Sequence, residues 1–170
     1  RIPCFMSSDS SDSGRRRSTV HQPVMLREVL HWLDLEPGLV VVDGTVGAGG
    51  HSQHILRRIE PDGRLLGFDR DPAMLERARE VLSGANYELY QASYSELPTV
   101  LDETGRTGVD RILVDLGLSS DQLSDNDRGF SFNATGPLDL RFDTGSGRPA
   151  AEWLAELDQR ALAGLFAKSD

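Results

Sequence analysis

Four glycines, Gly44, Gly47, Gly49 and Gly50, fall within seven positions of one another, directly after a short apolar run. Fixing a glycine costs roughly 0.5–1 kcal/mol of extra backbone entropy, so the cluster indicates that a ligand or a neighbouring backbone comes close. A dinucleotide-binding turn has the pattern G-x-G-x-x-G, and a match starting at Gly47 would need its third glycine at Ser52. The segment therefore argues against a nicotinamide cofactor and remains compatible with an adenosine-type ligand that has no pyrophosphate.

Three aspartates, Asp43, Asp69 and Asp115, each close a predicted strand and are expected to ring one crevice beside the glycine turn. In a doubly wound sheet, ligands bind beyond the carboxyl ends of the strands. A carboxylate offers two acceptor oxygens, so Asp69 is suited to hold both hydroxyls of a ribose. Three carboxylates disfavour a phosphate and favour a cation, which fits S-adenosylmethionine with its ribose diol and sulfonium. The alternative is that each aspartate is only a helix cap or a turn residue.

The histidines give a weaker indication. His21, His31 and His54 have no zinc-ligand spacing to the single cysteine, Cys4, or to carboxylates, so no metal site is expected. His51, within the glycine-rich segment, has two interpretations: a cap at the start of a helix or a cofactor contact.

These residues need a scaffold, and strand and helix patterns alternate up to Leu116. Apolar runs predict buried strands at 39–42, 64–69, 87–91 and 111–116. Helical spacing predicts helices at 21–33, 51–59 and 72–82, and a short helix at 94–105. Pro23 and Pro72 suit first helical positions, Asp71 suits an N-cap, and Trp32 and Trp153 are expected in the core. The alternation predicts a doubly wound, mostly parallel α/β sheet with helices on both faces.

The pattern changes after Leu116. Residues 117–149 are loop-like, and two short helical patterns follow at 150–157 and 159–166, the second capped by Asp158. No fifth strand is predicted, so the sheet looks unfinished. We expect a disordered Ser/Asp/Arg-rich tail at 1–19, a cofactor-binding half at 20–116, and loops with the start of a helical domain at 117–170. The tail is read as a solvated leader, or alternatively as a phosphate-contacting arm.

Composition limits the class of protein. The chain has 170 residues and a net charge of −9, which does not suit a general nucleic-acid coat, so contact with RNA needs a local basic patch. One cysteine, Cys4, excludes a disulfide within the chain and fits a cytoplasmic protein. No apolar run approaches ~20 residues, so neither a membrane span nor a membrane partner is expected.

Six segments in unbroken order resemble the small-subunit ribosomal RNA cytosine methyltransferases: HQPVMLREVL, VDGTVGAGGHS, GFDRDP, DLGLSSDQL, RGFSF and GPLDLRFD. The resemblance covers about residues 20–166. It implies a Rossmann-like methyltransferase that transfers a methyl group from S-adenosylmethionine to the exocyclic amine of a cytosine in the decoding region. Family members are longer, and the chain would end near the start of their inserted helical substrate domain. The implied partner is small-subunit ribosomal RNA, whereas the oligomeric state stays open.

The resemblance also implies site residues. The positions that match its cofactor contacts are Gly49, Gly50, His51, Asp69, Tyr94, Asp115 and Gln122. Among these, Asp69 corresponds to the ribose-binding acid and Tyr94 to an aromatic residue near the adenine.

The chemistry needs alignment and an acceptor for a hydrogen of the amine, without a metal. Asp115 is the candidate catalytic residue, either by holding the cofactor or by taking that hydrogen. The chain has DLGL at 115–118 where many amino-methyltransferases have Asp/Asn-Pro-Pro-aromatic, so a base-stacking ring must come from elsewhere. Phe130 and Phe132 are candidates, with core packing as the alternative. Arg128 and Arg141 either contact phosphates or form surface ion pairs.

Three other functions stay open at this point. They are a methyltransferase of a small molecule or protein, a catalytically silent RNA-binding module, and a nicotinamide enzyme. A basic groove would favour RNA, and a small closed pocket would favour a small substrate.

Overall fold

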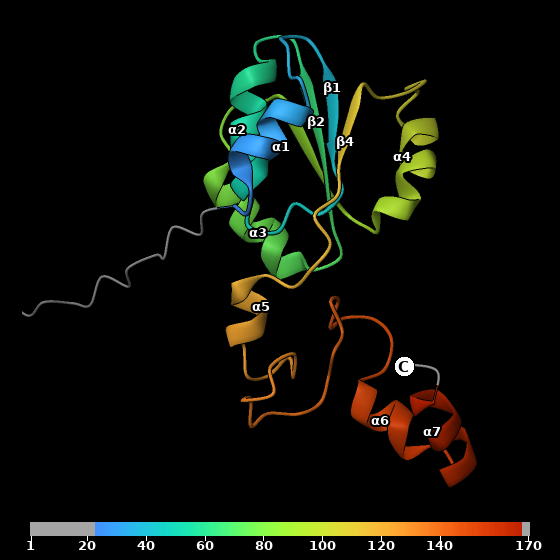
Figure 1. Ribbon diagram of the computed structural model, residues 1–170. Coiled ribbons are helices and arrows are strands. Elements are labelled where there is room, and N and C mark those ends of the chain that lie inside the picture. The colour runs from blue at the N-terminus through green and yellow to red at the C-terminus, as the bar shows by residue number, and fades with distance from the viewer. Residues whose placement is uncertain (1–22, 168–170) are drawn as a thin grey trace, which may run out of the picture.

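The computed structural model describes residues 23–167, and its centre is a four-stranded sheet with the order β3-β2-β1-β4 (Figure 1). The strands are β1 (Val40–Asp43), β2 (Arg64–Asp69), β3 (Tyr87–Gln91) and β4 (Arg111–Leu113). All three pairings are parallel. The order 3-2-1-4 is that of a doubly wound Rossmann-like sheet, so the predicted fold class is confirmed.

Helices cover both faces of the sheet. On one face lie α1 (Leu26–Trp32), α2 (Gly50–Ile59) and α3 (Pro72–Val81) (Figure 1). On the other lies α4 (Leu97–Glu103), preceded by the 3-10 helix η1 (Tyr94–Glu96); together they form the helix predicted at 94–105.

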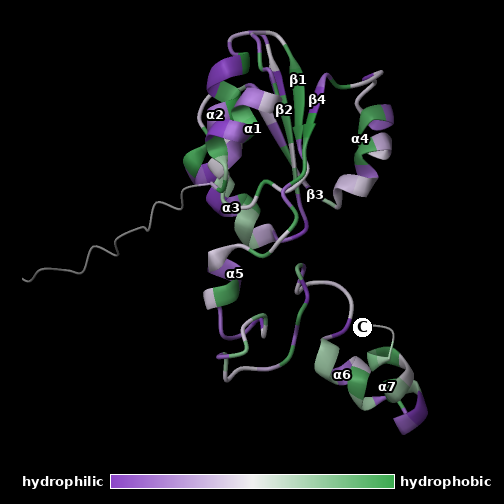
Figure 2. Ribbon diagram, in the orientation of Figure 1, coloured by the Kyte–Doolittle hydropathy of each residue, from purple (hydrophilic) through white to green (hydrophobic). Residues whose placement is uncertain are grey.

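The core follows from the alternation of side chains along the strands. Val41 and Leu65 belong to the buried cluster that includes the apolar residues of α2, whereas Val42 and Leu66 pack with Val100 of α4. Figure 2 shows most of β1 coloured as hydrophobic, as expected for a strand buried on both faces. The side chain of Asp71 caps α3 as predicted, by accepting a hydrogen bond from the Ala73 amide at 3.0 Å.

The first helix begins later than the sequence predicts. Met25 is its N-cap, with φ at 52°, so the placement of Pro23 at the first helical position is wrong. Residues before the helix contact α2 instead: a Cβ at Gly50 would lie 3.3 Å from the Pro23 ring, and the Val24 carbonyl accepts a hydrogen bond from His51. These long-range contacts override the local helical pattern.

The fourth strand is shorter and more exposed than predicted. It ends at Leu113, so Asp115 lies in the following loop rather than at the strand end. Ile112 is 53% exposed, and β4 is an edge strand that pairs only with β1 within the described residues. The expectation of two core tryptophans is also wrong, since Trp32 is 80% and Trp153 41% exposed.

The remainder of the described chain extends away from the sheet (Figure 1). Residues 117–149 are irregular apart from α5 (Ser120–Ser124), which the loop prediction missed. The predicted helical patterns then form α6 (Ala150–Ala155) and α7 (Gln159–Phe166), and the side chain of Asp158 caps α7. The predicted tail at 1–19 and His21 lie outside the described residues.

Candidate functional site

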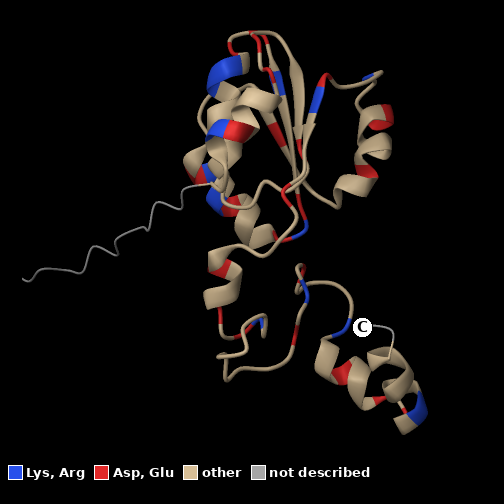
Figure 3. Cartoon of the chain, in the orientation of Figure 1, with Lys and Arg blue, Asp and Glu red and all other residues tan. Residues whose placement is uncertain are grey.

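A pocket of about 1240 Å³ opens where the chain leaves the carboxyl ends of the strands. Its walls are the residues before α1, the glycine turn after β1 with the first turn of α2, and the end of β2 with one side of α3. The segment from β3 into η1, the loop after β4 with the start of α5, and one residue from much further along the chain complete them. Figure 3 marks positions of both acidic and basic residues along the chain at this end of the sheet. Six of the seven predicted cofactor residues line it: Gly50, His51, Asp69, Tyr94, Asp115 and Gln122.

Close neighbours and left-handed backbone explain why the turn after β1 contains glycines. A Cβ at Gly44 would lie 2.9 Å from the Cβ of Tyr94, so a side chain there would displace the aromatic wall of the pocket. Gly47 has φ at 53° and donates its amide to the Asp69 carboxylate at 2.9 Å. Gly49 has φ at 83° and faces Ala78 of α3, where a Cβ would lie 3.3 Å from the backbone. Gly49 is absent from the pocket wall, and its left-handed backbone together with the contact to α3 accounts for a glycine at this position.

Asp43 does not belong to the ring of crevice acids that the sequence predicts. Its side chain is 1% exposed and accepts hydrogen bonds from the Ser52 hydroxyl at 2.6 Å and the Thr45 amide at 3.2 Å. Burial raises the pKa of the Asp43 carboxyl, although these hydrogen bonds oppose the shift. Asp43 therefore stabilises the glycine turn through buried hydrogen bonds. Its partner Ser52 occupies the position at which a dinucleotide-binding pattern would have its third glycine.

Asp69 lies at the end of β2 with its carboxylate in the pocket wall. One oxygen accepts the Gly47 amide and the other accepts the Asp71 amide, each at 2.9 Å. Burial raises the pKa of the Asp69 carboxyl, and the two amide hydrogen bonds oppose that shift. Each oxygen retains acceptor capacity for a ligand hydroxyl, since a carboxylate has about four lone-pair sites. The side chain is thus fixed in orientation and able to accept two more hydrogen bonds.

His51 and Asp115 are neighbours in the wall of the pocket. His51 is not the N-cap of α2, because Gly49 holds that position. The Nε2 atom of His51 lies 3.0 Å from the Val24 carbonyl oxygen. A carbonyl oxygen can only accept a hydrogen bond, so Nε2 is the donor of this bond and Nδ1 is not engaged in it. Nδ1 lies 4.0 Å from a carboxylate oxygen of Asp115, whose side chain is 53% exposed. The Asp115 amide donates to the Thr45 hydroxyl at 2.7 Å, which ties the loop to the glycine turn.

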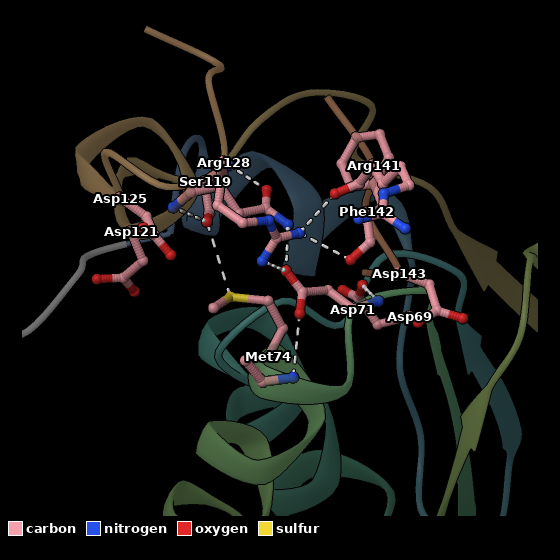
Figure 4. Close-up of polar contacts among 12 residues, drawn as sticks. Asp69, Asp71, Met74, Ser119, Asp121, Asp125, Arg128, Arg141, Phe142 and Asp143 are labelled. Atoms are coloured by element: carbon pink, nitrogen blue, oxygen red, sulfur yellow. Dashed lines mark hydrogen bonds and ion pairs between the residues drawn. The ribbon is translucent and has the colours of Figure 1, made fainter. Parts of the chain in front are cut away.

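Gln122 lines the pocket, but its side-chain amide is already bound at both ends. Its oxygen accepts the Ser119 amide at 3.0 Å and its nitrogen donates to Asp71 at 3.1 Å. Figure 4 shows the adjoining cluster, in which the guanidinium of Arg128 also meets Asp71, at 2.9 Å. Gln122 is therefore held by the turn after β2.

Of the aromatic and basic residues proposed to contact RNA, three are engaged in contacts within the protein and one is exposed. Arg128 is buried and Arg141 binds Asp139 at 2.7 Å, so both are engaged within the protein rather than free for phosphates. Phe130 packs against Phe142 with ring centroids 5.4 Å apart, as the packing alternative expects. Phe132 is fully exposed and remains a candidate for stacking on a base.

Sequence reasoning missed several residues of the pocket wall, among them Thr45 and Phe142. Thr45 lies within the glycine segment, but no pattern indicates that its hydroxyl accepts the Asp115 amide. Phe142 lines the pocket twenty positions after Gln122, the preceding lining residue, and no local signal in its irregular segment predicts that placement.

Within residues 23–167, no group of three or more His, Cys, Asp or Glu side chains could hold a metal ion. None of the helices in this part of the chain is long and apolar enough to cross a membrane.

Comparison with known proteins gives a consistent result. The model of the MraW methylase family matches residues 18–169. The ribosomal RNA small subunit methyltransferase H of Geobacter sulfurreducens is 48% identical over 148 residues, which are 86% of this chain and 48% of that protein. The protein of the same name from Shewanella denitrificans is 40% identical, over 86% of this chain and 47% of its own length. The chain spans about half the length of the curated relatives it matches.

Proposed function

Because this chain belongs to the MraW methylase family, we propose that it carries the cofactor site of an S-adenosylmethionine-dependent methyltransferase acting on ribosomal RNA. The proposed acceptor is the exocyclic amine of a cytosine in the small subunit. The names of the relatives support the RNA substrate. The observation that carries the cofactor is Asp69, fixed by two backbone amides in the wall of the pocket beside the glycine turn.

The residues in the pocket wall fit this cofactor. Asp69 would hold the ribose hydroxyls, and Tyr94, 44% exposed, would lie against the adenine. His51 and Asp115 would hold the amino-acid end, where an ammonium group suits a carboxylate. A pyrophosphate would meet Asp69 and Asp115, so the same wall disfavours a nicotinamide dinucleotide. Gln122, bound at both ends of its amide, would act mainly through shape.

The bound cofactor would supply a methyl group that is already activated by the sulfonium. The protein then has to align the cytosine amine and accept a hydrogen from it. Asp115 is the one predicted site acid with a largely exposed side chain at the pocket mouth, so it is the residue we propose for contact with the reacting groups. It serves either by holding the ammonium of the cofactor or by taking the hydrogen of the amine.

The division of labour along the chain is part of the proposal. Residues 20–116 would supply most of the cofactor site, to which Gln122 and Phe142 add part of the wall. Residues 117–170 would begin the part that meets the RNA, with Phe132 exposed for stacking on a base. A ribosomal substrate would place the protein in the cytoplasm.

Isothermal calorimetry of the full-length protein with S-adenosylmethionine, and separately with NAD, tests the proposal. We expect saturable one-site binding of S-adenosylmethionine and no heat of binding with NAD. Binding of NAD without binding of S-adenosylmethionine would overturn the assignment of the pocket. Binding of S-adenosylmethionine with methyl transfer only to a small molecule or protein would leave the cofactor site and overturn the RNA substrate.

A further inference from the structure

Phe142 is the single pocket-lining residue that comes from the described segment after Gln122. It belongs to an irregular stretch without helix or strand, so neither a helical ladder nor a sheet fixes its place. Something else must hold this part of the wall beside the glycine turn and the end of β2.

The contacts of Arg128 supply that support. One terminal nitrogen of its guanidinium donates to the carbonyls of Arg141 and Phe142, at 2.8 and 2.7 Å. The other pairs with Asp71 at 2.9 Å. The Phe130 ring lies 5.7 Å from the guanidinium carbon and also contacts the Phe142 ring. Figure 4 shows Arg128 extended between the Arg141–Phe142 backbone on one side and Asp71 on the other.

Asp71 connects this support to the ribose acid. Its side chain is 1% exposed, caps α3, and also accepts the Gln122 amide nitrogen. Its backbone amide donates to the carboxylate of Asp69 at 2.9 Å. A continuous series of contacts therefore runs from the Phe142 carbonyl through Arg128 and Asp71 to Asp69.

The ion pair between Arg128 and Asp71 is better explained by the positioning of its neighbours than by a gain in fold stability. A buried ion pair seldom stabilises a fold more than apolar residues of the same volume. The Nε of Arg128 is moreover the buried side-chain nitrogen or oxygen without a hydrogen-bond partner in the described part of the chain. Leaving such a donor unpaired lowers the stability of the fold. What an apolar side chain could not do is bind two successive carbonyls and a carboxylate at once.

We propose that Arg128 is a positioning residue of the cofactor pocket: it fixes Phe142 as a wall of the pocket and joins that wall to the Asp69–Asp71 turn. The inference rests on the proposed function for the identity of the ligand, but the placement of Phe142 by Arg128 can be measured without any ligand.

The first measurement is hydrogen exchange on the full-length protein without cofactor. The Leu140 amide donates to the Arg128 carbonyl and the Arg141 amide donates to Asp139, so both report order in this segment. In Arg128→Met these amides should exchange about tenfold faster or more, while amides of β1 and β2 keep their protection. Unchanged exchange at Leu140 and Arg141 would overturn the inference, whether or not the protein binds S-adenosylmethionine.

The second measurement is the dissociation constant for S-adenosylmethionine. Arg128→Met should raise it on the order of tenfold, and Arg128→Lys, which keeps the charge but not the planar fork, should give an intermediate value. Arg148→Met is the matched control, because Arg148 forms an ion pair with Glu156 in which both side chains are more than half exposed. That control should bind like the wild type.

A double-mutant cycle with Phe142→Ala separates positioning from a general loss of stability. If Arg128 acts through the wall, the effect of Arg128→Met on the dissociation constant should shrink to about twofold or less in the Phe142→Ala background. At saturating cofactor, kcat of Arg128→Met should change less than the dissociation constant. Equal effects in both backgrounds would contradict the inference. If Arg128→Met does not fold, Arg128→Lys is carried through the same cycle. If the wild type does not bind the cofactor, the proposed function fails, and the exchange result alone decides the role of Arg128.

Discussion

Replacement of Asp69 by asparagine tests the ribose contact with little change in shape. In the free protein the Asp69 carboxylate accepts the amides of Gly47 and Asp71, and asparagine has only one acceptor oxygen for these two donors. One amide then faces a side-chain NH2 group, which costs about 1–3 kcal/mol of stability. Burial disfavours the charged form of the Asp69 carboxyl and raises its pKa, so removal of the charge offsets part of that cost. The variant should therefore fold with a lowered melting temperature.

The effect on binding should be larger and specific to the ribose. A hydrogen bond to a charged group contributes about 1.5–3 kcal/mol, so Asp69→Asn should raise the dissociation constant of S-adenosylmethionine by about 10–150-fold. Calorimetry well below the melting temperature measures it. Asp62→Asn, which removes a charge from the exposed turn before β2, is the control and should bind normally.

An analogue of the cofactor that lacks both ribose hydroxyls makes the test decisive. It cannot use the Asp69 carboxylate, so the wild type and Asp69→Asn should bind it with dissociation constants within about twofold of each other. If the variant weakens the analogue and the natural cofactor equally, Asp69 acts only by holding the glycine turn. That result would refute the assignment of Asp69 as the ribose acid.

Three further variants probe the turn and the mouth of the pocket. Burial raises the folded-state pKa of Asp43 above its ordinary value of 3.8, so the contribution of this carboxyl to wild-type stability is lost as pH rises from that value through the folded-state pKa. The unfolding free energy of Asp43→Asn minus that of the wild type should therefore become more positive between about pH 3 and pH 7. Chemical denaturation measures both, and a difference that stays constant with pH would contradict this. Gly44→Ala should weaken cofactor binding by displacing Tyr94, whereas Gly108→Ala, with nothing within 4 Å of its Cβ, should not; equal calorimetric affinities would refute the argument. Asp115→Asn should raise the cofactor dissociation constant if Asp115 holds the cofactor, or lower the saturated rate of methyl transfer by about 10²-fold if it accepts the amine hydrogen; no change in either would remove Asp115 from the site.

The sheet was predictable because its signals are local. The run before Asp43 is apolar at every position, as burial on both faces requires, and the cap at Asp71 with Pro72 after it marks the start of α3. The glycine turn and the acid after β2 follow from the same topology, since parallel strands bring their carboxyl ends to one edge.

The errors lie where long-range contacts decide. Pro23 leaves the helical pattern because it packs on Gly50. Asp43 and Asp69 look alike in the sequence, yet Ser52 is the partner of one and Gly47 of the other.

Residues 117–149 show the same limit more strongly. The hydrogen bonds of Arg128 join positions 13 and 14 residues apart, and its ion pair reaches back to Asp71. Such contacts follow no periodic pattern in the sequence and cannot be predicted from it. The resemblance to a family indicated Gln122, whereas the roles of Arg128 and Phe142 became visible only in the structure.

Methyl transfer to its proposed acceptor tests the central claim most directly. The full-length protein would be incubated with small ribosomal subunits from cells that lack it and with S-adenosylmethionine labelled in the methyl group. The RNA would then be digested and its nucleosides separated by mass spectrometry. The account predicts the label on the exocyclic amine of a single cytidine. Label on a ring carbon, on another base or on protein, or no transfer by a protein that binds the cofactor, would contradict it.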